Sequence, residues 1–274
     1  MTLSGRDVAA LLARHGLHPS RALGQNFVVD PNTVRRIARL AGVGPGDQVI
    51  EIGAGLGSLT LALAETGAAV TAIEVDRGIA PVLRTVVEDK GVRVIEADAR
   101  HLDWPAVLGD DRWTLVANLP YNVATPLVAD LLDGVPQIER MLVMVQREVG
   151  ERLAASAGDE AYGAVSVKVA YWAHAEVVGR VPATVFLPKP KVESALVRIV
   201  RREAPAVGGD VDAKWLFRLV RAGFGQRRKM LRGSLAGLAT RAQIEAAGIA
   251  PTARAEELDV EAWGRLAREA APRG

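Results

Sequence analysis

Short apolar runs alternate with amphipathic segments through the first half of the chain. Runs of four to eight apolar or β-branched residues fit strands that are buried on both faces of a sheet. The predicted strands are Gln48 to Ile52, Ala69 to Val75, Val92 to Ala97, Thr114 to Ala117 and Met141 to Gln146. Helical spacing between them predicts helices at Ser58 to Glu65, Arg77 to Glu88 and Thr125 to Leu132. This alternation predicts an α/β fold of Rossmann-like type, a parallel sheet with helices on both faces.

Two helical patterns precede the alternation. The first runs from Ser4 to His15 and ends at Gly16, a residue suited to a left-handed C-terminal cap. The second starts at Asp30-Pro31, with Asp as N-cap and Pro in the first turn, and runs to Leu40. We expect residues 1–41 to form an N-terminal helical extension.

The pattern changes after Gln146. A helix is predicted from Arg147 to Ala155. The Val- and Tyr-rich runs that follow predict antiparallel strands that complete the sheet, at Ala164 to Trp172, Glu176 to Val181 and Ser194 to Val200. Residues 204–209 contain one Pro and two Gly, a composition that predicts a linker. The residue patterns after this linker are helical. We therefore predict a larger domain at 1–203 and a small all-α domain at 204–274.

Composition limits the classes of protein that remain. The chain has 274 residues, 49% of them hydrophobic, which is enough for the cores of two domains. Cys is absent and the four His are scattered, so no metal site is expected. No apolar run approaches the ~18 residues of a membrane span, and the start lacks a signal-peptide pattern. We expect a cytoplasmic protein without a membrane partner.

The net charge of +2 conceals a basic stretch. Between Lys189 and Arg232 there are twelve Lys and Arg against four Asp and Glu, a net charge of +8. Such an excess favours a polyanionic partner, although a solvated basic face is the alternative interpretation of any charge run.

A glycine-rich turn follows the first predicted strand. It reads Gly53-Ala54-Gly55-Leu56-Gly57, so its spacing is Gly-x-Gly-x-Gly. Glycines at this place let the backbone approach a ligand at the carboxyl end of the strand. A dinucleotide site uses Gly-x-Gly-x-x-Gly to bring a pyrophosphate onto a helix N-terminus, so the spacing argues against NAD.

Two acidic residues follow the next two strands. Glu74 could accept hydrogen bonds from both hydroxyls of a ribose, and Asp98 could accept from an adenine amine. Each alone also fits an ordinary helix N-cap or a solvated loop acid. Because carboxyl ends of parallel strands meet at one edge of a sheet, the acids, the glycine turn and Asn118 are expected around one crevice. The combination predicts adenosine with a non-phosphate tail, which is S-adenosylmethionine.

The fourth predicted strand runs into Asn118-Leu119-Pro120-Tyr121. The Asn118 side-chain oxygen and the Leu119 carbonyl can accept both N–H groups of an exocyclic amine and free its lone pair for attack on a sulfonium methyl. Pro120 would fix the turn, and Tyr121 offers a ring for stacking on a base taken out of its helix. A simple strand-to-helix turn is the alternative.

These motifs together resemble the KsgA-type ribosomal RNA adenine dimethyltransferases, a family related to the Erm resistance methyltransferases. The resemblance covers nearly the whole chain. The matching motifs are Leu23 to Val28, Glu51 to Gly57, Glu74, Asp98, Asn118 to Tyr121, Gln146 to Val149, Ala161 to Gly163, Phe186 to Ser194 and Arg227 to Arg232. Two departures are small and apolar: Val28 stands where the family usually has Leu, and Ala54 where it usually has Pro.

The resemblance implies dimethylation of N6 on two adjacent adenosines in the 3′-terminal hairpin of 16S rRNA, within a partly assembled 30S subunit. S-adenosylmethionine would be converted to S-adenosylhomocysteine without a metal. The implied cofactor contacts are Asn26, Val28, Gly53, Gly55, Glu74, Asp98 and Asn118. The implied surroundings of the target base are Asn118, Leu119, Pro120, Tyr121 and Phe186, with Phe186 stacking opposite Tyr121.

A basic stripe is expected to bind the RNA backbone. Lys214, Arg218 and Arg221 fall at helical spacing on one polar face, and Arg228 and Arg232 repeat that spacing. The predicted RNA-binding residues are Lys189, Lys191, Lys214, Arg218, Arg221, Arg227, Arg228 and Arg232. An amphipathic core helix with a solvated face is the alternative. We expect a monomer.

Other functions fit less well. An Erm-type methyltransferase of 23S rRNA would share the pocket and the catalytic corner. A non-catalytic assembly factor would not need Glu74, Asp98 and Asn118, and a small-molecule methyltransferase would not need the +8 stretch. A dehydrogenase fits least because the glycine spacing is wrong.

Overall fold

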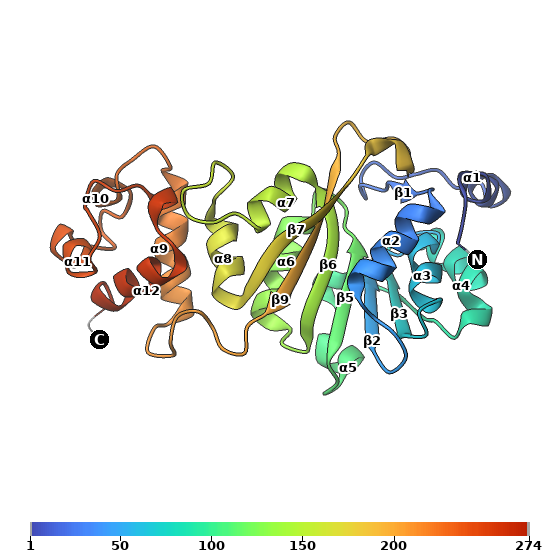
Figure 1. Ribbon diagram of the computed structural model, residues 1–274, viewed down its shortest axis with the longest axis horizontal. Coiled ribbons are helices and arrows are strands. Elements are labelled where there is room, and N and C mark those ends of the chain that lie inside the picture. Colours follow the sequence, from blue (N-terminus) through green and yellow to red (C-terminus); the bar gives the residue numbers. More distant parts are fainter. Residues whose placement is uncertain (1, 273–274) are drawn as a thin grey trace. The chain divides into compact units, whose positions relative to one another are not determined.

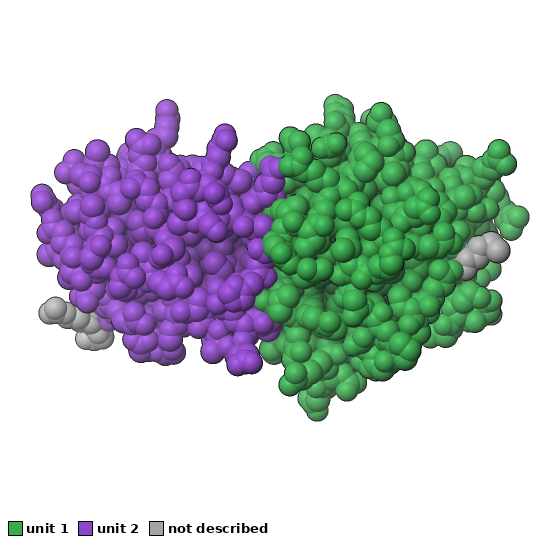
Figure 2. Space-filling view, in the orientation of Figure 1, with its two compact units in different colours: residues 1–150, 176–200 green, residues 151–175, 201–274 purple. Residues whose placement is uncertain are grey.

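The computed structural model describes residues 2–272 (Figure 1). Contacts between residues divide the chain into two compact units. The first comprises residues 1–150 and 176–200, and the second comprises 151–175 and 201–274 (Figure 2).

A seven-stranded sheet is the centre of the first unit. Its strand order is β4-β3-β2-β5-β6-β9-β7. The strands span β2 Gln48–Ile52, β3 Ala69–Glu74, β4 Arg93–Glu96, β5 Trp113–Asn118, β6 Ile138–Gln146, β7 Ala173–Val181 and β9 Ser194–Arg201. The pairs from β4 to β6 are parallel and β9 runs antiparallel to β6. The five predicted parallel strands and the antiparallel strand at 194–200 are therefore confirmed, and the carboxyl ends of β2, β3, β4 and β5 meet at one edge.

Helices pack on this sheet because their apolar positions recur at helical spacing. Val34 and Ile37 of α2 lie in one buried cluster with Val49, Val116 and Leu142 of the strands. The helices here are α1 Gly5–Arg14, α2 Pro31–Ala41, α3 Ser58–Ala64, α4 Ile79–Val87, α5 Trp104–Leu108 and α6 Ala124–Gly134. The sequence did not predict α5, a single short turn. The predicted helices at 4–15, 31–40, 58–65, 77–88 and 125–132 are confirmed within a few residues.

Short elements complete this unit. The 3₁₀ turns are η1 Glu88–Lys90, η2 Ala99–His101 and η3 Ala183–Val185. A small two-stranded sheet pairs β1 Phe27–Val28 with β8 Phe186–Leu187 in antiparallel fashion. This pairing joins segments that are far apart in the sequence, and it brings the loop before β1 to the carboxyl edge of the large sheet (Figure 1).

The second unit is helical. Its elements are α8 Ala164–Trp172, α9 Ala213–Gly225, α10 Leu231–Ser234, α11 Arg241–Ala246, η4 Ala255–Glu257 and α12 Val260–Glu269, and α7 Arg147–Leu153 runs across its boundary. Its core surrounds the fully buried Trp263 and includes Leu216, Leu219 and Leu266. The tyrosine of the Ala161 to Gly163 motif, Tyr162, is buried there and donates to the Leu258 carbonyl over 2.9 Å. That motif therefore stabilises the helical unit.

One predicted strand is wrong: Ala164 to Trp172 forms helix α8. Its Val and Tyr content favours a strand locally. The Ser166 hydroxyl, however, accepts from the Gly163 amide over 3.0 Å and donates to the Arg152 carbonyl, which starts a helix. Val167 and Tyr171, four residues apart, both enter the core of the helical unit. Helical spacing of the buried side chains thus outweighs strand propensity.

The compact units differ from the predicted domain limits in one segment. Residues 151–175, which the prediction assigned to the first domain, pack with 201–274. The predicted linker at 204–209 is also anchored, since Val207 is buried and the Ala206 amide donates to the Tyr171 carbonyl. The division into domains at 1–203 and 204–274 stays a prediction.

Candidate active site

The glycine turn between β2 and α3 has a backbone conformation and packing that require glycine at Gly55. Gly55 has a φ of +59°, in the left-handed region that favours glycine. A Cβ atom added there would lie 3.0 Å from two carbons of the Phe27 ring. The Gly55 amide donates to Glu74 Oε2 over 2.7 Å, which ties the turn to the end of β3.

Glu74 is buried at the carboxyl end of β3, with 4% of its surface exposed. Its second oxygen, Oε1, accepts from the Asp76 amide over 2.9 Å. Burial raises the pKa of Glu74, and the two backbone N–H groups oppose that shift by stabilising the charged form. Helix α4 begins only at Ile79, with Gly78 as its N-cap, so Glu74 is no helix cap. It is a carboxylate held in place beside the turn.

The corner after β5 presents two acceptors side by side in the chain. The Asn118 amide Nδ2 donates to the Asn26 carbonyl over 3.0 Å, which fixes the side chain. The Leu119 amide donates to the Met144 carbonyl, and the Leu119 side chain is buried. Within residues 2–272 no hydrogen bond occupies Asn118 Oδ1 or the Leu119 carbonyl. Both oxygens remain available to a donor.

The Tyr121 side chain is held by strand β9, which lies two strands away from β5 in the same sheet. Its hydroxyl lies 3.0 Å from the hydroxyl of Ser194, which is fully buried at the start of β9. Ser194 stands opposite Gln146 in the β6–β9 ladder. The hydrogen bond therefore connects the loop after β5 with β9, past the end of β6. Burial raises the pKa of the Tyr121 phenol.

A cavity collects these groups. It encloses about 710 Å³ of space between atoms, a figure that includes the solvent at its open mouth. The predicted residues that line it are Asn26, Val28, Gly53, Gly55, Glu74, Asn118, Leu119, Pro120 and Tyr121. The acidic side chains of its lining are Glu51 and Glu74, and the lining includes no Lys, Arg or His. Its electrostatics favour a cationic ligand.

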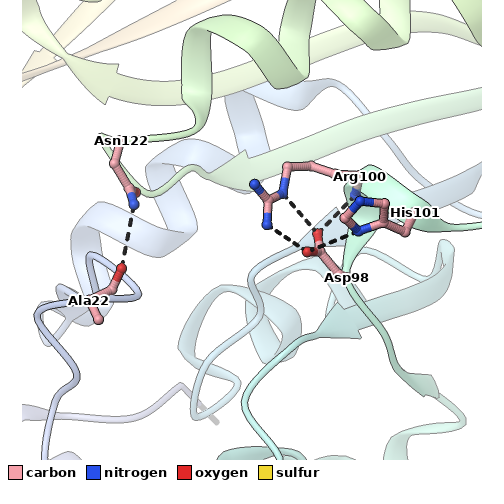
Figure 3. A network of polar contacts seen from close by, with 5 residues as sticks. All are labelled: Ala22, Asp98, Arg100, His101 and Asn122. Atoms are coloured by element: carbon pink, nitrogen blue, oxygen red, sulfur yellow. Dashed lines mark hydrogen bonds and ion pairs between the residues drawn. The ribbon is translucent and has the colours of Figure 1, made fainter.

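Asp98 lies in a second, adjoining cavity of about 700 Å³ that shares Leu23, Gly53, Val75 and Pro120 with the first. Figure 3 shows its carboxylate between Arg100 and His101. Arg100 Nη2 donates to it over 2.7 Å and lowers its pKa to about 2. Asp98 also accepts from the Arg100 amide and so caps the 3₁₀ turn η2.

The loop that precedes β1 borders both cavities. Gln25 Nε2 donates to Asp76 over 2.8 Å, and Asn122 Nδ2 donates to the Ala22 carbonyl over 3.4 Å (Figure 3). Together with the Asn118–Asn26 bond, these contacts hold the motif Leu23 to Val28 against the strand ends. That motif is thus part of the site although it lies far from the other motifs in sequence.

Phe186 takes a different place. It pairs with Val28 between β8 and β1 and is buried in the apolar cluster beneath α2. It does not belong to the lining of either cavity described above. Its stacking opposite Tyr121 stays a prediction.

Sequence reasoning missed Glu51 as a site residue. It lines the first cavity with only 2% of its surface exposed, and burial raises its pKa to about 8, with the neighbouring charge of Glu74 adding to the shift. The feature of the sequence that could have revealed it is a single acidic residue inside the otherwise apolar end of the strand Gln48–Ile52. Ser194 was also missed as a partner of Tyr121, because 73 residues separate them.

All eight predicted RNA-binding residues are exposed, in two separate units. Lys189 and Lys191 lie in the first unit, and the other six belong to the helical unit. In the described chain, Arg221, Arg228 and Arg232 have no side-chain hydrogen bond or ion pair. Arg227 is already engaged, since its Nε lies 2.8 Å from Glu256 and its Nη2 donates to the Glu160 carbonyl. The contribution of each residue to RNA binding stays a prediction.

Residues 2–272 contain no cluster of three or more His, Cys, Asp or Glu with the geometry of a metal site. Among the helices of the same residues, none has both the length and the apolar character needed to cross a bilayer.

Comparison with known proteins decides the family. A family model described as ribosomal RNA adenine dimethylase matches residues 18–271. This chain belongs to that family. Two similar relatives carry the name ribosomal RNA small subunit methyltransferase A. The one from Cutibacterium acnes is 49% identical over 97% of this chain and 92% of its own length, and the one from Thermobifida fusca is 46% identical over 97% and 95%.

Solved structures agree with the family at the level of the fold. The 23S rRNA methyltransferase ErmE has a TM-score of 0.71 and 28% identity, over 90% of this chain and all of its own. A dimethyladenosine transferase from Plasmodium falciparum also has a TM-score of 0.71, with 23% identity over 86% of this chain and 94% of its own. The Rossmann-like methyltransferase fold predicted from the strand and helix pattern is confirmed.

Proposed function

We propose that this protein is an S-adenosylmethionine-dependent methyltransferase that dimethylates N6 of two adjacent adenosines in the 3′-terminal hairpin of 16S rRNA. Its substrate is the rRNA within a partly assembled 30S subunit, so the enzyme contributes to small-subunit biogenesis. It acts in the cytoplasm, as a single copy.

The observation that carries the choice of cofactor is the charge of the main cavity. Two carboxyl groups and no basic side chain line it. A phosphate-bearing dinucleotide would meet repulsion there, whereas a ligand with a sulfonium and an ammonium group would be attracted. The Gly-x-Gly-x-Gly spacing of the turn supports the same choice.

The residues present fit S-adenosylmethionine. The turn at Gly53 and Gly55 lines the cavity, and Glu74 keeps lone pairs for ribose hydroxyls after accepting two backbone N–H groups. Asp98 would accept from the adenine amine in the adjoining cavity, where it also binds Arg100. When bound, the cofactor supplies an electrophilic methyl group on sulfur.

The corner Asn118 to Tyr121 would receive the target adenine. Asn118 Oδ1 and the Leu119 carbonyl accept the two N–H groups of N6 and draw its lone pair out of the ring system. Tyr121, held by Ser194, stacks on the extruded base. Because the amine needs no strong base, the protein contributes alignment and electrostatic stabilisation. As N6 bonds to the methyl carbon, the bond from that carbon to sulfur would break, and the methylated nitrogen would then lose its extra proton to water.

The choice of the small subunit rests on the relatives. Those named small subunit methyltransferase A are 43–49% identical over almost the full chain. ErmE, which is named a 23S rRNA methyltransferase, is 28% identical and supports large-subunit rRNA as the second candidate substrate. A non-catalytic assembly factor is disfavoured because the acceptors at Asn118 and Leu119 are intact and unoccupied in the described chain.

One experiment tests the proposal directly. The protein is incubated with S-adenosylmethionine labelled in its methyl group and with 30S or 50S subunits that lack the modification, and the label is then mapped. We expect N6,N6-dimethyladenosine at two adjacent positions near the 3′ end of 16S rRNA. Label in 23S rRNA would favour the second candidate, and no label in either subunit would contradict a methyltransferase function.

A further inference from the structure

Glu51 is a buried carboxyl that no step of the proposed reaction uses. It lies on β2 and lines the main cavity, with 2% of its surface exposed. Within residues 2–272 its Oε2 atom has no hydrogen-bond partner. An ionised carboxylate without a partner is strongly disfavoured in such a place, because burial removes the water that would stabilise its charge.

The groups around Glu51 do not offset that cost. Helix α3 contributes Ser58 and Thr60, which are uncharged; the Thr60 hydroxyl lowers the pKa of Glu51, but by less than burial raises it. Strand β3 contributes Glu74, whose negative charge opposes a second one nearby. Asn118 from β5, with Gln25 and Asn26 from the loop before β1, adds only neutral groups. The cavity therefore contains two carboxyls in unequal environments: Glu74 with two backbone donors, and Glu51 with none on Oε2.

We propose that Glu51 holds a proton while the cavity contains no cation and gives it up when a cationic ligand enters. On the proposed function, on which this inference rests, binding of S-adenosylmethionine would release about one proton from the protein at neutral pH. A positive ligand beside Glu51 supplies the attraction that its surroundings lack, so the charged carboxylate becomes the stable form. Affinity for the ligand then rises with pH, because the ligand-free protein binds one more proton than the complex.

Titration calorimetry of S-adenosylmethionine into the full-length protein tests this. Measurement at pH 7 in two buffers of different ionisation enthalpy gives the number of protons released. The ligand's own amino group titrates in the same range, so the informative quantity is the difference between variants. We expect the parent protein to release about one proton more than Glu51→Gln, whose amide imitates the protonated acid in shape.

The matched control is Glu96→Gln. Glu96 is an exposed carboxylate on β4, outside both cavities, that pairs with Arg84 over 3.6 Å. We expect this variant to release as many protons as the parent. A second measurement is the dissociation constant of S-adenosylmethionine between pH 6 and 8. It should fall by up to about tenfold per pH unit in the parent and clearly less in Glu51→Gln.

Equal proton release by the parent and Glu51→Gln, or parallel pH profiles of their dissociation constants, would overturn the inference while leaving the proposed function standing. Failure of the parent protein to bind S-adenosylmethionine at any pH would overturn the proposed function, and this inference with it. The two failures are therefore distinguishable in one set of titrations.

Discussion

Individual side chains at the carboxyl edge of the sheet have different polar environments and therefore different chemical roles. Asn118 is held by the Asn26 carbonyl and offers its oxygen, Glu74 is held by two amides, and Glu51 is buried with one oxygen unpartnered. The orientations of Asn118 and Glu74 are thus settled by contacts with backbone atoms. Such rigid placement suits a reaction whose barrier is lowered mainly by alignment.

Replacement of Asn118 tests the acceptor role at the scale of one residue. We expect Asn118→Ala to lower kcat by at least about 100-fold, comparable to loss of one preorganised polar group at a reacting centre. Binding of S-adenosylmethionine should be weaker but measurable by calorimetry. Full methyl transfer by this variant on unmethylated 30S subunits would refute the role.

Glu51 also predicts a pH dependence of stability. Its pKa is about 8 in the folded protein and near 4.5 when the side chain is exposed. Between these values the folded state binds one more proton, so this group's contribution to the free energy of unfolding declines as pH rises, by up to about 1.4 kcal/mol per pH unit. Below pH 4.5 the contribution is fully present, and above pH 8 it is lost.

Glu51→Gln should remove that slope. Urea unfolding of the parent and the variant at pH 5, 6 and 7 measures the difference in their unfolding free energies, in which other groups cancel. We expect the parent to lose stability relative to the variant as pH increases. A difference that stays constant with pH would show that Glu51 ionises normally.

At the scale of elements, the ends of strands and the turns after them decide what the cavity can hold. The turn after β2 approaches the ligand through Gly55, the corner after β5 carries the acceptors, and β9 reaches across β6 to fix Tyr121. Packing of β1 against β8 brings the loop before β1 to the same edge. The site is therefore built from four separate parts of the chain.

The glycine turn predicts unequal costs for two alanine substitutions. Gly55 and Gly91 both have positive φ, which costs an alanine about 1–2 kcal/mol. Only at Gly55 would the added Cβ also meet the Phe27 ring, at 3.0 Å, whereas nothing lies within 4 Å at Gly91. We expect Gly55→Ala to lower Tm further than Gly91→Ala and to weaken binding of S-adenosylmethionine. Equal Tm shifts and unchanged binding would contradict this account of the turn.

Strand β9 supplies a positioning residue, Ser194. We expect Ser194→Ala and Tyr121→Phe each to lower kcat about tenfold, because each frees the ring from the same hydrogen bond. The double variant should be no worse than either single one. The dissociation constant of S-adenosylmethionine should stay unchanged in all three. Additive losses would mean that the two hydroxyls act independently.

A buried serine elsewhere gives the control for this cycle. Ser234 in the helical unit is 5% exposed, and its hydroxyl has no partner among residues 2–272. Ser234→Ala should leave kcat at the parent value.

At the scale of the whole molecule, the first unit carries the pocket, and the helical unit carries six of the eight basic residues that were predicted to bind RNA. In the described chain, Arg221, Arg228 and Arg232 are exposed and have no side-chain partners. Arg227, by contrast, forms an ion pair with Glu256 and donates a hydrogen bond to the Glu160 carbonyl, so it stabilises the fold. Arg227 and Arg228 therefore differ, although they are adjacent: the first is bound within the protein and the second is available to a partner. Phosphate contacts of this kind set affinity and register more than sequence choice.

Charge reversal tests the basic surface. We expect Arg221→Glu and Arg228→Glu each to weaken binding to 16S rRNA in the unmethylated 30S subunit, and to reduce the salt dependence of log K by about 0.7–0.9 per lost phosphate contact. Arg241→Glu is the control, since Arg241 is exposed but paired with Glu245 on the same helix. Binding that is unaffected at both low and moderate salt would remove these arginines from the RNA surface.

The sequence by itself determined the elements whose signals are local. The parallel strands, the glycine turn and the Asn118 corner could be predicted because each depends on residues adjacent in the chain, and their order along an α/β pattern places their ends at one edge. The family followed from the same motifs. Only the tertiary structure decided the assignment of 164–172 to helix α8, the Tyr121–Ser194 bond, the pairing of Arg227 and the burial of Glu51. Each of these depends on burial or on partners many residues away, which exist only once the chain has packed.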